Sequence, residues 1–147
     1  MKHIIPLFLF LAWIGQPLMA EDAEKARVVT FKSNPVKCLA AIRVTTIDGR
    51  LRTVPAMGFD IEPGEHTLKG PATLDFRNCE PAQSRTRKQE SIPPLNWYFE
   101  AGKVYYVGLD YSSPQRAEWR YVVWKVEYED GEVVFDITEP DPDVPKS

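Results

Sequence analysis

Acid or base chemistry in this 147-residue chain would have to use His66, because its other histidine, His3, lies in the N-terminal leader. His66 follows the turn Pro63-Gly64, and no Gly-x-Ser-x-Gly motif supplies a serine nucleophile to pair with it. A partly exposed turn residue at the start of a strand is the simpler interpretation. We therefore expect no catalytic residue and no enzyme; a hydrolase that uses His66 with a nearby acid is the alternative.

Carboxylates gather at one place in the sequence, where Glu127, Glu129, Asp130 and Glu132 lie close together. Such a group could support acid and base catalysis or bind calcium, but it lacks EF-hand spacing, and Asp130 is explained by an Asp-Gly turn. Phosphate-binding glycine loops are absent. We expect a solvated surface here, with no metal and no cofactor.

The chain has two cysteines, Cys38 and Cys79. Together with His66 they supply too few ligands for a structural zinc site, which takes four. In an exported protein an even number of cysteines predicts a disulfide. Closing that loop would stabilise the fold by about 4 kcal/mol on the chain-entropy model.

The N-terminus has the pattern of a secretory signal peptide. The basic start Met1-Lys2-His3 precedes an apolar run over residues 4–15, which at about a dozen residues is too short to span a bilayer. Ala20 offers a small residue for cleavage before the charged residues 21–25. We predict a signal peptide over residues 1–20 and a periplasmic or secreted protein, with an uncleaved anchor as the alternative. No later segment is apolar enough for a stable membrane span.

The charge balance excludes a nucleic-acid partner. Eighteen Lys and Arg residues against 21 Asp and Glu give −3, and removal of Lys2 with the leader gives 17 − 21 = −4. With 44% hydrophobic residues the chain can form a core. Thirteen prolines against eight glycines, in a chain rich in Val, Thr and Tyr, favour short strands over long helices.

Short strands between Pro and Gly turns predict a single all-β domain, an antiparallel β-sandwich over residues 27–138. Residues 21–26 are expected to be a flexible N-terminus, and residues 139–147 a disordered acidic Pro-rich tail. An alternating strand is expected over residues 38–47, followed by a hairpin turn at Asp48-Gly49. In this hairpin Thr46 is expected opposite Leu51 and Ile42 opposite Pro55, with Arg43 and Arg52 on the other, charged face. The remaining strands are expected over residues 27–32, 59–61, 66–69, 73–77, 96–100, 103–111, 119–129 and 132–138.

The clearest hairpin signal surrounds Asp130-Gly131. A two-residue loop pairs Lys125 with Asp136 on one face and apolar residues on the other. The apolar pairs are Tyr128 with Val133, Val126 with Phe135, and Trp124 with Ile137. This register predicts that Trp124, Val126, Phe135 and Ile137 point into the core.

Two surfaces are candidates for partner binding. Arg85, Arg87 and Lys88 give residues 78–94 a positive charge that contrasts with the acidic remainder and suits an anionic partner, although a solvated loop is the alternative. Tyr106, Trp119 and Tyr121 could form an outward aromatic row. Coverage of these rings by a loop or by long cationic side chains is the other interpretation.

Residues 58–68, Gly-Phe-Asp-Ile-Glu-Pro-Gly-Glu-His-Thr-Leu, and residues 99–106, Phe-Glu-Ala-Gly-Lys-Val-Tyr-Tyr, carry a family resemblance. An apolar strand, a Pro-Gly turn and a His-x-Leu strand, followed by a tyrosine-rich strand after Ala-Gly-Lys, resemble the PEGA-type small domains of bacterial envelope proteins. The resemblance covers about Ile42 to Val126. It implies an immunoglobulin-like or transthyretin-like sandwich with a non-catalytic surface role.

These observations predict a secreted, non-enzymatic β-sandwich of the bacterial cell envelope, acting as a binding or accessory module. Its partner would be an envelope protein, a glycan or an anionic surface. A small inhibitor or immunity-type protein that blocks an envelope enzyme is one alternative, and an envelope hydrolase that uses His66 is another.

Overall fold

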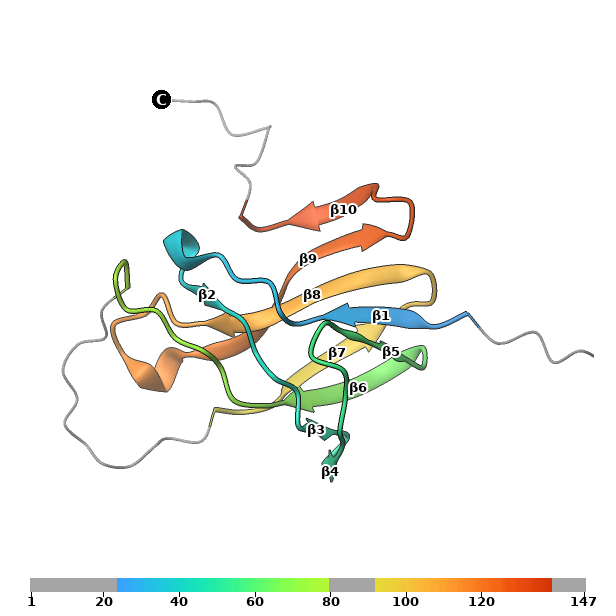
Figure 1. Ribbon diagram of the computed structural model, residues 1–147, viewed down its shortest axis with the longest axis horizontal. Coiled ribbons are helices and arrows are strands. Elements are labelled where there is room, and N and C mark those ends of the chain that lie inside the picture. The colour runs from blue at the N-terminus through green and yellow to red at the C-terminus, as the bar shows by residue number, and fades with distance from the viewer. Residues whose placement is uncertain (1–23, 80–91, 139–147) are drawn as a thin grey trace, which may run out of the picture.

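The computed structural model describes residues 24–79 and 92–138, which form two β-sheets packed together (Figure 1). In the larger sheet the strand order is β10-β9-β8-β1-β5, with β2 also paired to β8. Its strands are β1 (Ala26–Val29), β2 (Leu39–Ala40), β5 (Phe59–Ile61), β8 (Lys103–Asp110), β9 (Arg120–Tyr128) and β10 (Val133–Asp136).

The smaller sheet has the order β4-β3-β6-β7. Its strands are β3 (Thr46–Ile47), β4 (Arg50–Leu51), β6 (Gly64–Lys69) and β7 (Leu95–Phe99). Two short 3₁₀ helices, η1 (Pro35–Lys37) and η2 (Arg116–Glu118), lie in the connections. The predicted all-β sandwich is confirmed.

One strand pair departs from the antiparallel pattern. β1 runs parallel to β8, with Val28 opposite Tyr105, while its other edge pairs antiparallel with β5. β1 also begins at Ala26, which is buried, so the sheet starts one residue before the predicted boundary of the domain.

The strand predicted over residues 38–47 is divided between the two sheets. β2 pairs with β8 in the larger sheet, whereas β3 pairs with β6 in the smaller one. Between them Ile42 forms a bridge with Ala72, so the predicted pair of Ile42 with Pro55 is wrong. The predicted pair of Thr46 with Leu51 is confirmed.

The strand predicted over residues 73–77 is also wrong. The Asp75 side chain accepts a hydrogen bond from the backbone N–H of Arg77, at 3.1 Å, and forms an ion pair with its guanidinium. This local turn competes with strand pairing. The Arg77 contact also lowers the pKa of the Asp75 carboxyl to about 2.

Alternation along β8 fills the space between the sheets. Tyr105, Val107 and Leu109, which recur at a spacing of two within the predicted strand 103–111, are buried on one face. From the smaller sheet, Phe99 of β7 meets Tyr105 edge to face, with ring centroids 4.9 Å apart. The core therefore joins the two sheets through strands that are adjacent in sequence.

A β-bulge in β9 changes the inward face predicted for the C-terminal hairpin. Tyr106 pairs with Lys125 but Val107 pairs with Val123, which leaves Trp124 as the extra residue. Trp124 packs against Tyr106 on the outer face, with ring centroids 5.3 Å apart. Trp124 is thus buried, at 8% exposure, but the prediction that it points into the core is wrong. The core residues of β9 are Tyr121, Val123 and Val126.

The hairpin itself forms with part of the predicted register. The pairs Val126 with Phe135 and Lys125 with Asp136 are confirmed. Val133 pairs with Glu127 instead of Tyr128, because the register shifts between Val133 and Phe135. Ile137 is 57% exposed, so its predicted inward position is wrong.

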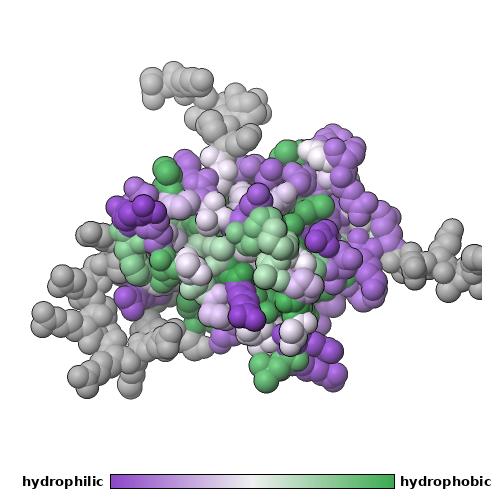
Figure 2. Space-filling view, viewed as in Figure 1, coloured by the Kyte–Doolittle hydropathy of each residue, from purple (hydrophilic) through white to green (hydrophobic). Residues whose placement is uncertain are grey.

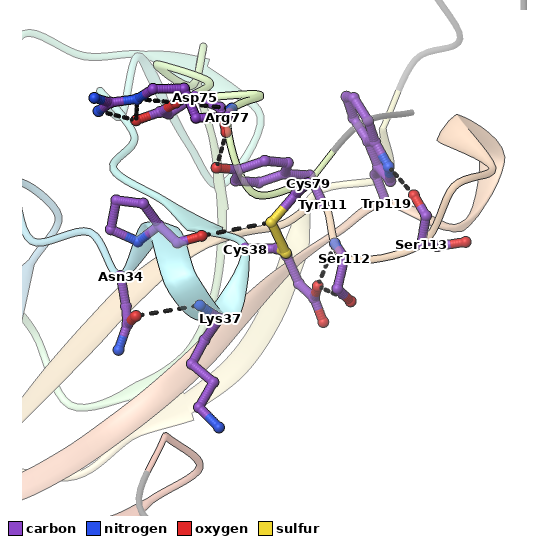
Figure 3. Close-up of a disulfide and its surroundings, with 12 residues drawn as sticks. Asn34, Lys37, Cys38, Asp75, Arg77, Cys79, Tyr111, Ser112, Ser113 and Trp119 are labelled. Carbon is purple, nitrogen blue, oxygen red and sulfur yellow. Dashed lines mark hydrogen bonds and ion pairs between the residues drawn. A yellow bond between two sulfur atoms is a disulfide. The ribbon is translucent and has the colours of Figure 1, made fainter. Parts of the chain in front are cut away.

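The predicted disulfide between Cys38 and Cys79 is present (Figure 3). Cys38 follows η1, whose first turn is capped by the Asn34 side chain, which accepts from the backbone N–H of Lys37 at 3.2 Å. The bond therefore ties the η1 turn to the segment that precedes residue 80.

Aromatic side chains close the same end of the sandwich. Figure 3 shows Tyr111 and Trp119 beside the disulfide. The Tyr111 hydroxyl donates to the carbonyl of Asp75 at 2.7 Å, and Trp119 Nε1–H donates to the carbonyl of Ser113 at 2.9 Å. Phe76 packs against both rings. We call Cys38, Phe76, Cys79, Tyr111 and Trp119 the disulfide corner.

Candidate functional site

An open groove lies between the two sheets, beside their edge strands β4 and β5. Its volume is about 520 Å³, within the range of roughly 300–1,000 Å³ typical of ligand sites. It is lined by Arg27, Ile47, Arg52, Thr53, Val54, Pro55, Met57, Gly58, Phe59 and Asp60. We call it the intersheet groove.

The groove is largely apolar because it is the uncovered margin of the core. Phe59 of β5 is a buried core residue, and Ile47 of β3 and Val54 of the segment after β4 pack against the core. Met57, by contrast, is 62% exposed. Figure 2 shows apolar residues gathered across the middle of one face and at the tip of the β3–β4 hairpin, with hydrophilic residues around them.

Gly58 fixes the wall of the groove. Its φ is +118°, and a Cβ there would lie 2.5 Å from the carbonyl oxygen of Val28. Only glycine lets the chain pass this close to β1 in this conformation. The turn before it is closed by the N–H of Gly58, which donates to the carbonyl of Pro55 at 3.3 Å. Met57 is therefore held on a defined turn beside β5.

The two arginines of the groove lining differ in whether a carboxylate balances their charge. Arg27 forms an ion pair with Asp60, its Nη1 lying 3.2 Å from Oδ1. Arg52 uses its backbone N–H to bond the carbonyl of Thr45 at 2.9 Å, but its guanidinium has no ion pair or hydrogen bond within residues 24–79 and 92–138. The lining thus carries one uncompensated positive charge beside apolar side chains.

The side chains of this lining suit contact with a ligand. They include neither histidine nor cysteine nor serine, and the one carboxylate among them, that of Asp60, is paired with Arg27. An apolar ligand surface could be buried against Phe59 and Met57 while an oxyanion meets Arg52.

His66 lies outside the groove lining and connects two turns. Its Nδ1 is 2.7 Å from Asp48 Oδ2, and its Nε2 is 2.7 Å from the carbonyl oxygen of Glu62. The backbone N–H of Thr67 donates to the other Asp48 oxygen at 2.9 Å. The hydrogen bond from His66, followed by that from Thr67, lowers the pKa of Asp48. The predicted turn residue therefore has both ring nitrogens engaged by the fold, with neither left for a substrate.

The predicted aromatic row does not form. Trp119 and Tyr121 are 6% and 9% exposed. Trp119 belongs to the disulfide corner, and the Tyr121 hydroxyl donates to the carbonyl of Gly70 at 2.6 Å. Tyr121 pairs with Leu109, an inward residue, whereas Tyr106 occupies the opposite face of β8. The predicted row fails because the bulge at Trp124 shifts the alternation along β9, so that Tyr121 faces the core and not the outer face.

Tyr106 is half-buried on the outer face of the larger sheet. Its hydroxyl donates to Glu127 Oε1 at 2.6 Å, and Lys125 Nζ lies 5.1 Å from its ring centre. Burial, together with the hydrogen bond to Glu127, raises the pKa of Tyr106 to about 12. Tyr106 is thus a neutral, hydrogen-bonded residue that lies apart from the groove.

Arg85, Arg87 and Lys88 lie outside the described residues, so their predicted role stays a prediction. The described residues that flank them in the sequence are Cys79, which the disulfide holds, and Ile92, which packs against the core.

Sequence reasoning missed the groove. Its components are scattered over β1, β3, β5 and the segment 52–58, and no short motif joins them. A usable signal was Met57 between Pro55 and Gly58, an apolar side chain in a turn where no strand face would bury it. In the predicted hairpin Arg52 lies on the charged face, a position that carries no indication of binding.

Within residues 24–79 and 92–138, no helix has the length and apolar character of a membrane span, and no cluster of three metal-binding side chains occurs. Comparison of the chain with protein family models, curated proteins and solved structures finds no match in any of the three.

Proposed function

We propose that the protein is a secreted, non-enzymatic binding module of the bacterial cell envelope and that the intersheet groove is its binding site. The single observation that carries the proposal is an open, largely apolar groove of about 520 Å³ whose lining includes Arg52, an arginine with no ion pair among the described residues. Exposed apolar surface next to a fixed charge is typical of recognition sites.

The leader and the disulfide support the location. Residues 1–20 have the pattern of a secretory signal, and the Cys38–Cys79 bond is compatible with an oxidising compartment. Export is tested by fractionating the cells and measuring the intact mass of the protein. A mass that corresponds to a start at Glu21 in the exported fraction supports the proposal, whereas an uncleaved cytoplasmic chain contradicts it.

Binding is tested by capture from envelope extract, including its lipid-extractable fraction, on immobilised exported protein. The key variant is Thr53→Trp, which places a large ring in the groove lining at an exposed position. The matched control is Thr73→Trp, an exposed threonine outside the lining. We expect Thr53→Trp alone to lose the captured component, at unchanged melting temperature. Equal capture by both variants contradicts the groove as the binding site.

A further inference from the structure

Resting on the proposed function, we propose that the intersheet groove binds a single-chain amphiphile with an oxyanion head group. The head group meets the guanidinium of Arg52, and the acyl chain lies along Met57, Phe59 and the apolar residues opposite them.

Arg52 is the position for the head group because the other charges near the groove are already paired. Arg27 is bonded to Asp60 at 3.2 Å, and the Asp48 carboxylate is bonded to His66 and to the backbone of Thr67. The guanidinium of Arg52 has no partner among the described residues and keeps its planar set of donors. Carboxylates and phosphates bind such a fork with two parallel hydrogen bonds.

The acyl chain is suited to the rest of the lining. Ile47 comes from β3 of the smaller sheet and Phe59 from β5 of the larger sheet, so both sheets contribute apolar side chains. Val54, Pro55 and Met57 add apolar side chains from the segment that joins β4 to β5. Met57 is unbranched and exposed, which lets it adjust to chains of different length. Each methylene group buried contributes to affinity in proportion to the apolar surface removed from water.

The strands beside the groove argue against an extended peptide as the occupant. A peptide that adds to a sheet edge needs a row of unpaired backbone groups. β4 has two residues and β5 has three, and Pro55 has no N–H to offer. Very short edge strands are poor templates for strand addition. An acyl chain needs no backbone partner, so the groove fits an amphiphile better than a peptide strand.

The test compares four probes with the same ten-carbon chain, each below its micellar concentration: decanoate, decyl phosphate, decanol and decyltrimethylammonium. Isothermal titration calorimetry on the exported protein should show saturable one-to-one binding of decanoate and decyl phosphate. Decanol should bind at least tenfold more weakly and the cation not measurably. The tighter of the two anions identifies carboxylate or phosphate as the head group. Equal affinity for all four probes, or none for either anion, overturns the proposal.

Two variants locate the head group and the chain. Arg52→Gln should weaken decanoate binding about tenfold, while Arg43→Gln, an exposed arginine outside the lining, should leave it unchanged. Met57→Glu, at an exposed position, should repel the anion and abolish its binding. Thermal melts establish that each variant is folded. Equal losses in Arg52→Gln and Arg43→Gln would show a general charge effect and contradict the assignment of Arg52.

The outcome is separable from that of the proposed function. If Thr53→Trp loses capture from envelope extract but no ten-carbon anion binds, the groove is a binding site for another ligand class. If decanoate binds and Thr53→Trp abolishes its binding, the amphiphile site stands even when the extract yields no captured component.

Discussion

The disulfide corner and the intersheet groove lie at two margins of one core, and they differ in how far side chains cover that core. At the corner the bond between Cys38 and Cys79 and the edge-to-face rings of Tyr111 and Trp119 cover the core, and both aromatic polar atoms have partners. At the groove Phe59 meets the surface beside exposed Met57. The molecule therefore holds its stabilising contacts at one margin and leaves apolar surface open at the other.

This separation has an energetic consequence. Residues whose replacement unfolds the protein should belong to the corner, where side chains are buried and bonded. Residues whose replacement affects only binding should be the exposed residues of the groove lining, such as Met57, where the backbone is fixed by Gly58. The following changes test the comparison, starting with the largest expected effect on stability.

Among the changes at the disulfide corner, removing the disulfide should cost the most stability. The bond closes a loop with a sequence separation of 41, and the chain-entropy model gives about 4 kcal/mol for a loop of that size. Replacing Cys38 and Cys79 together by Ser avoids a free thiol. Denaturant unfolding of the double variant should show a loss of roughly 2–5 kcal/mol. A variant as stable as the parent would show that the aromatic packing holds the corner without the bond.

Trp119 of the disulfide corner and Trp124 at the bulge of β9 form a matched pair. Trp119 Nε1–H donates to the carbonyl of Ser113, whereas Trp124 Nε1–H is buried without a hydrogen-bond partner within the part of the chain that the structure describes. Trp→Phe at each position removes similar volume, but only at position 119 does it remove a hydrogen bond.

The Trp119→Phe variant should therefore be less stable than Trp124→Phe by about 1 kcal/mol, since loss of the unpartnered N–H relieves a desolvation cost. Chemical denaturation of both proteins under one set of conditions measures the difference. A larger loss of stability in Trp124→Phe than in Trp119→Phe would contradict the inference that the Trp119 hydrogen bond stabilises the disulfide corner.

Asp48 gives a pH-dependent contribution of smaller size. Its folded-state pKa lies below the ordinary value of 3.8 because of the hydrogen bonds from His66 and Thr67. Its stabilisation is therefore fully present above pH 3.8 and is lost as the pH falls through the lower folded-state value. The Asp48 side chain is half-exposed, so screening limits the contribution to about 0.5–1 kcal/mol.

The measurement compares the parent with Asp48→Asn by urea unfolding from pH 6 to pH 2. The parent should be more stable at pH 6, and the two curves should converge at the acid end. Asp60→Asn serves as the control, because its ion pair with Arg27 is exposed and no backbone N–H within residues 24–79 and 92–138 donates to its carboxylate. A stability gap for Asp48→Asn that persists unchanged at pH 2 would rule out the titration of this carboxylate as its source.

The parts of the fold that could be read from the sequence are those set by local alternation. β8 shows it best, because Tyr105, Val107 and Leu109 recur at a spacing of two and all face the core. The disulfide was expected from the predicted leader and the number of cysteines, and it is present. The features that could not be predicted depend on contacts between distant residues. They are the parallel pairing of β1 with β8 and the bulge that places Trp124 on the outer face.

The candidate site was less predictable than the fold for the same reason. The intersheet groove joins Arg27, Ile47 and Phe59, which come from three strands in two sheets. Their proximity follows from the switch of the chain between the sheets after β2, and a one-residue shift between the Ile42–Ala72 and Thr46–Lys69 pairs sets which side chains face inward. No periodic pattern in residues 38–47 encodes that shift.

Met57→Ser should have the smallest effect on stability. The Met57 side chain is mostly exposed, and substitutions at such positions usually change the free energy of unfolding by no more than about 0.5 kcal/mol. Phe59, two residues along the same segment, is a buried core residue, and truncations of that kind cost roughly 3–5 kcal/mol. Met57→Ser and Phe59→Ala thus separate the surface of the groove from the core beneath it.

Denaturant unfolding should show Met57→Ser within error of the parent and Phe59→Ala strongly destabilised. Decanoate titration of the folded Met57→Ser protein should nevertheless show weaker binding, because apolar contact with the chain is lost. A large loss of stability in Met57→Ser would mean that the segment 52–58 supports the core as the disulfide corner does. The proposed division, in which the corner stabilises the fold and the exposed groove residues only bind, would then be wrong at Met57.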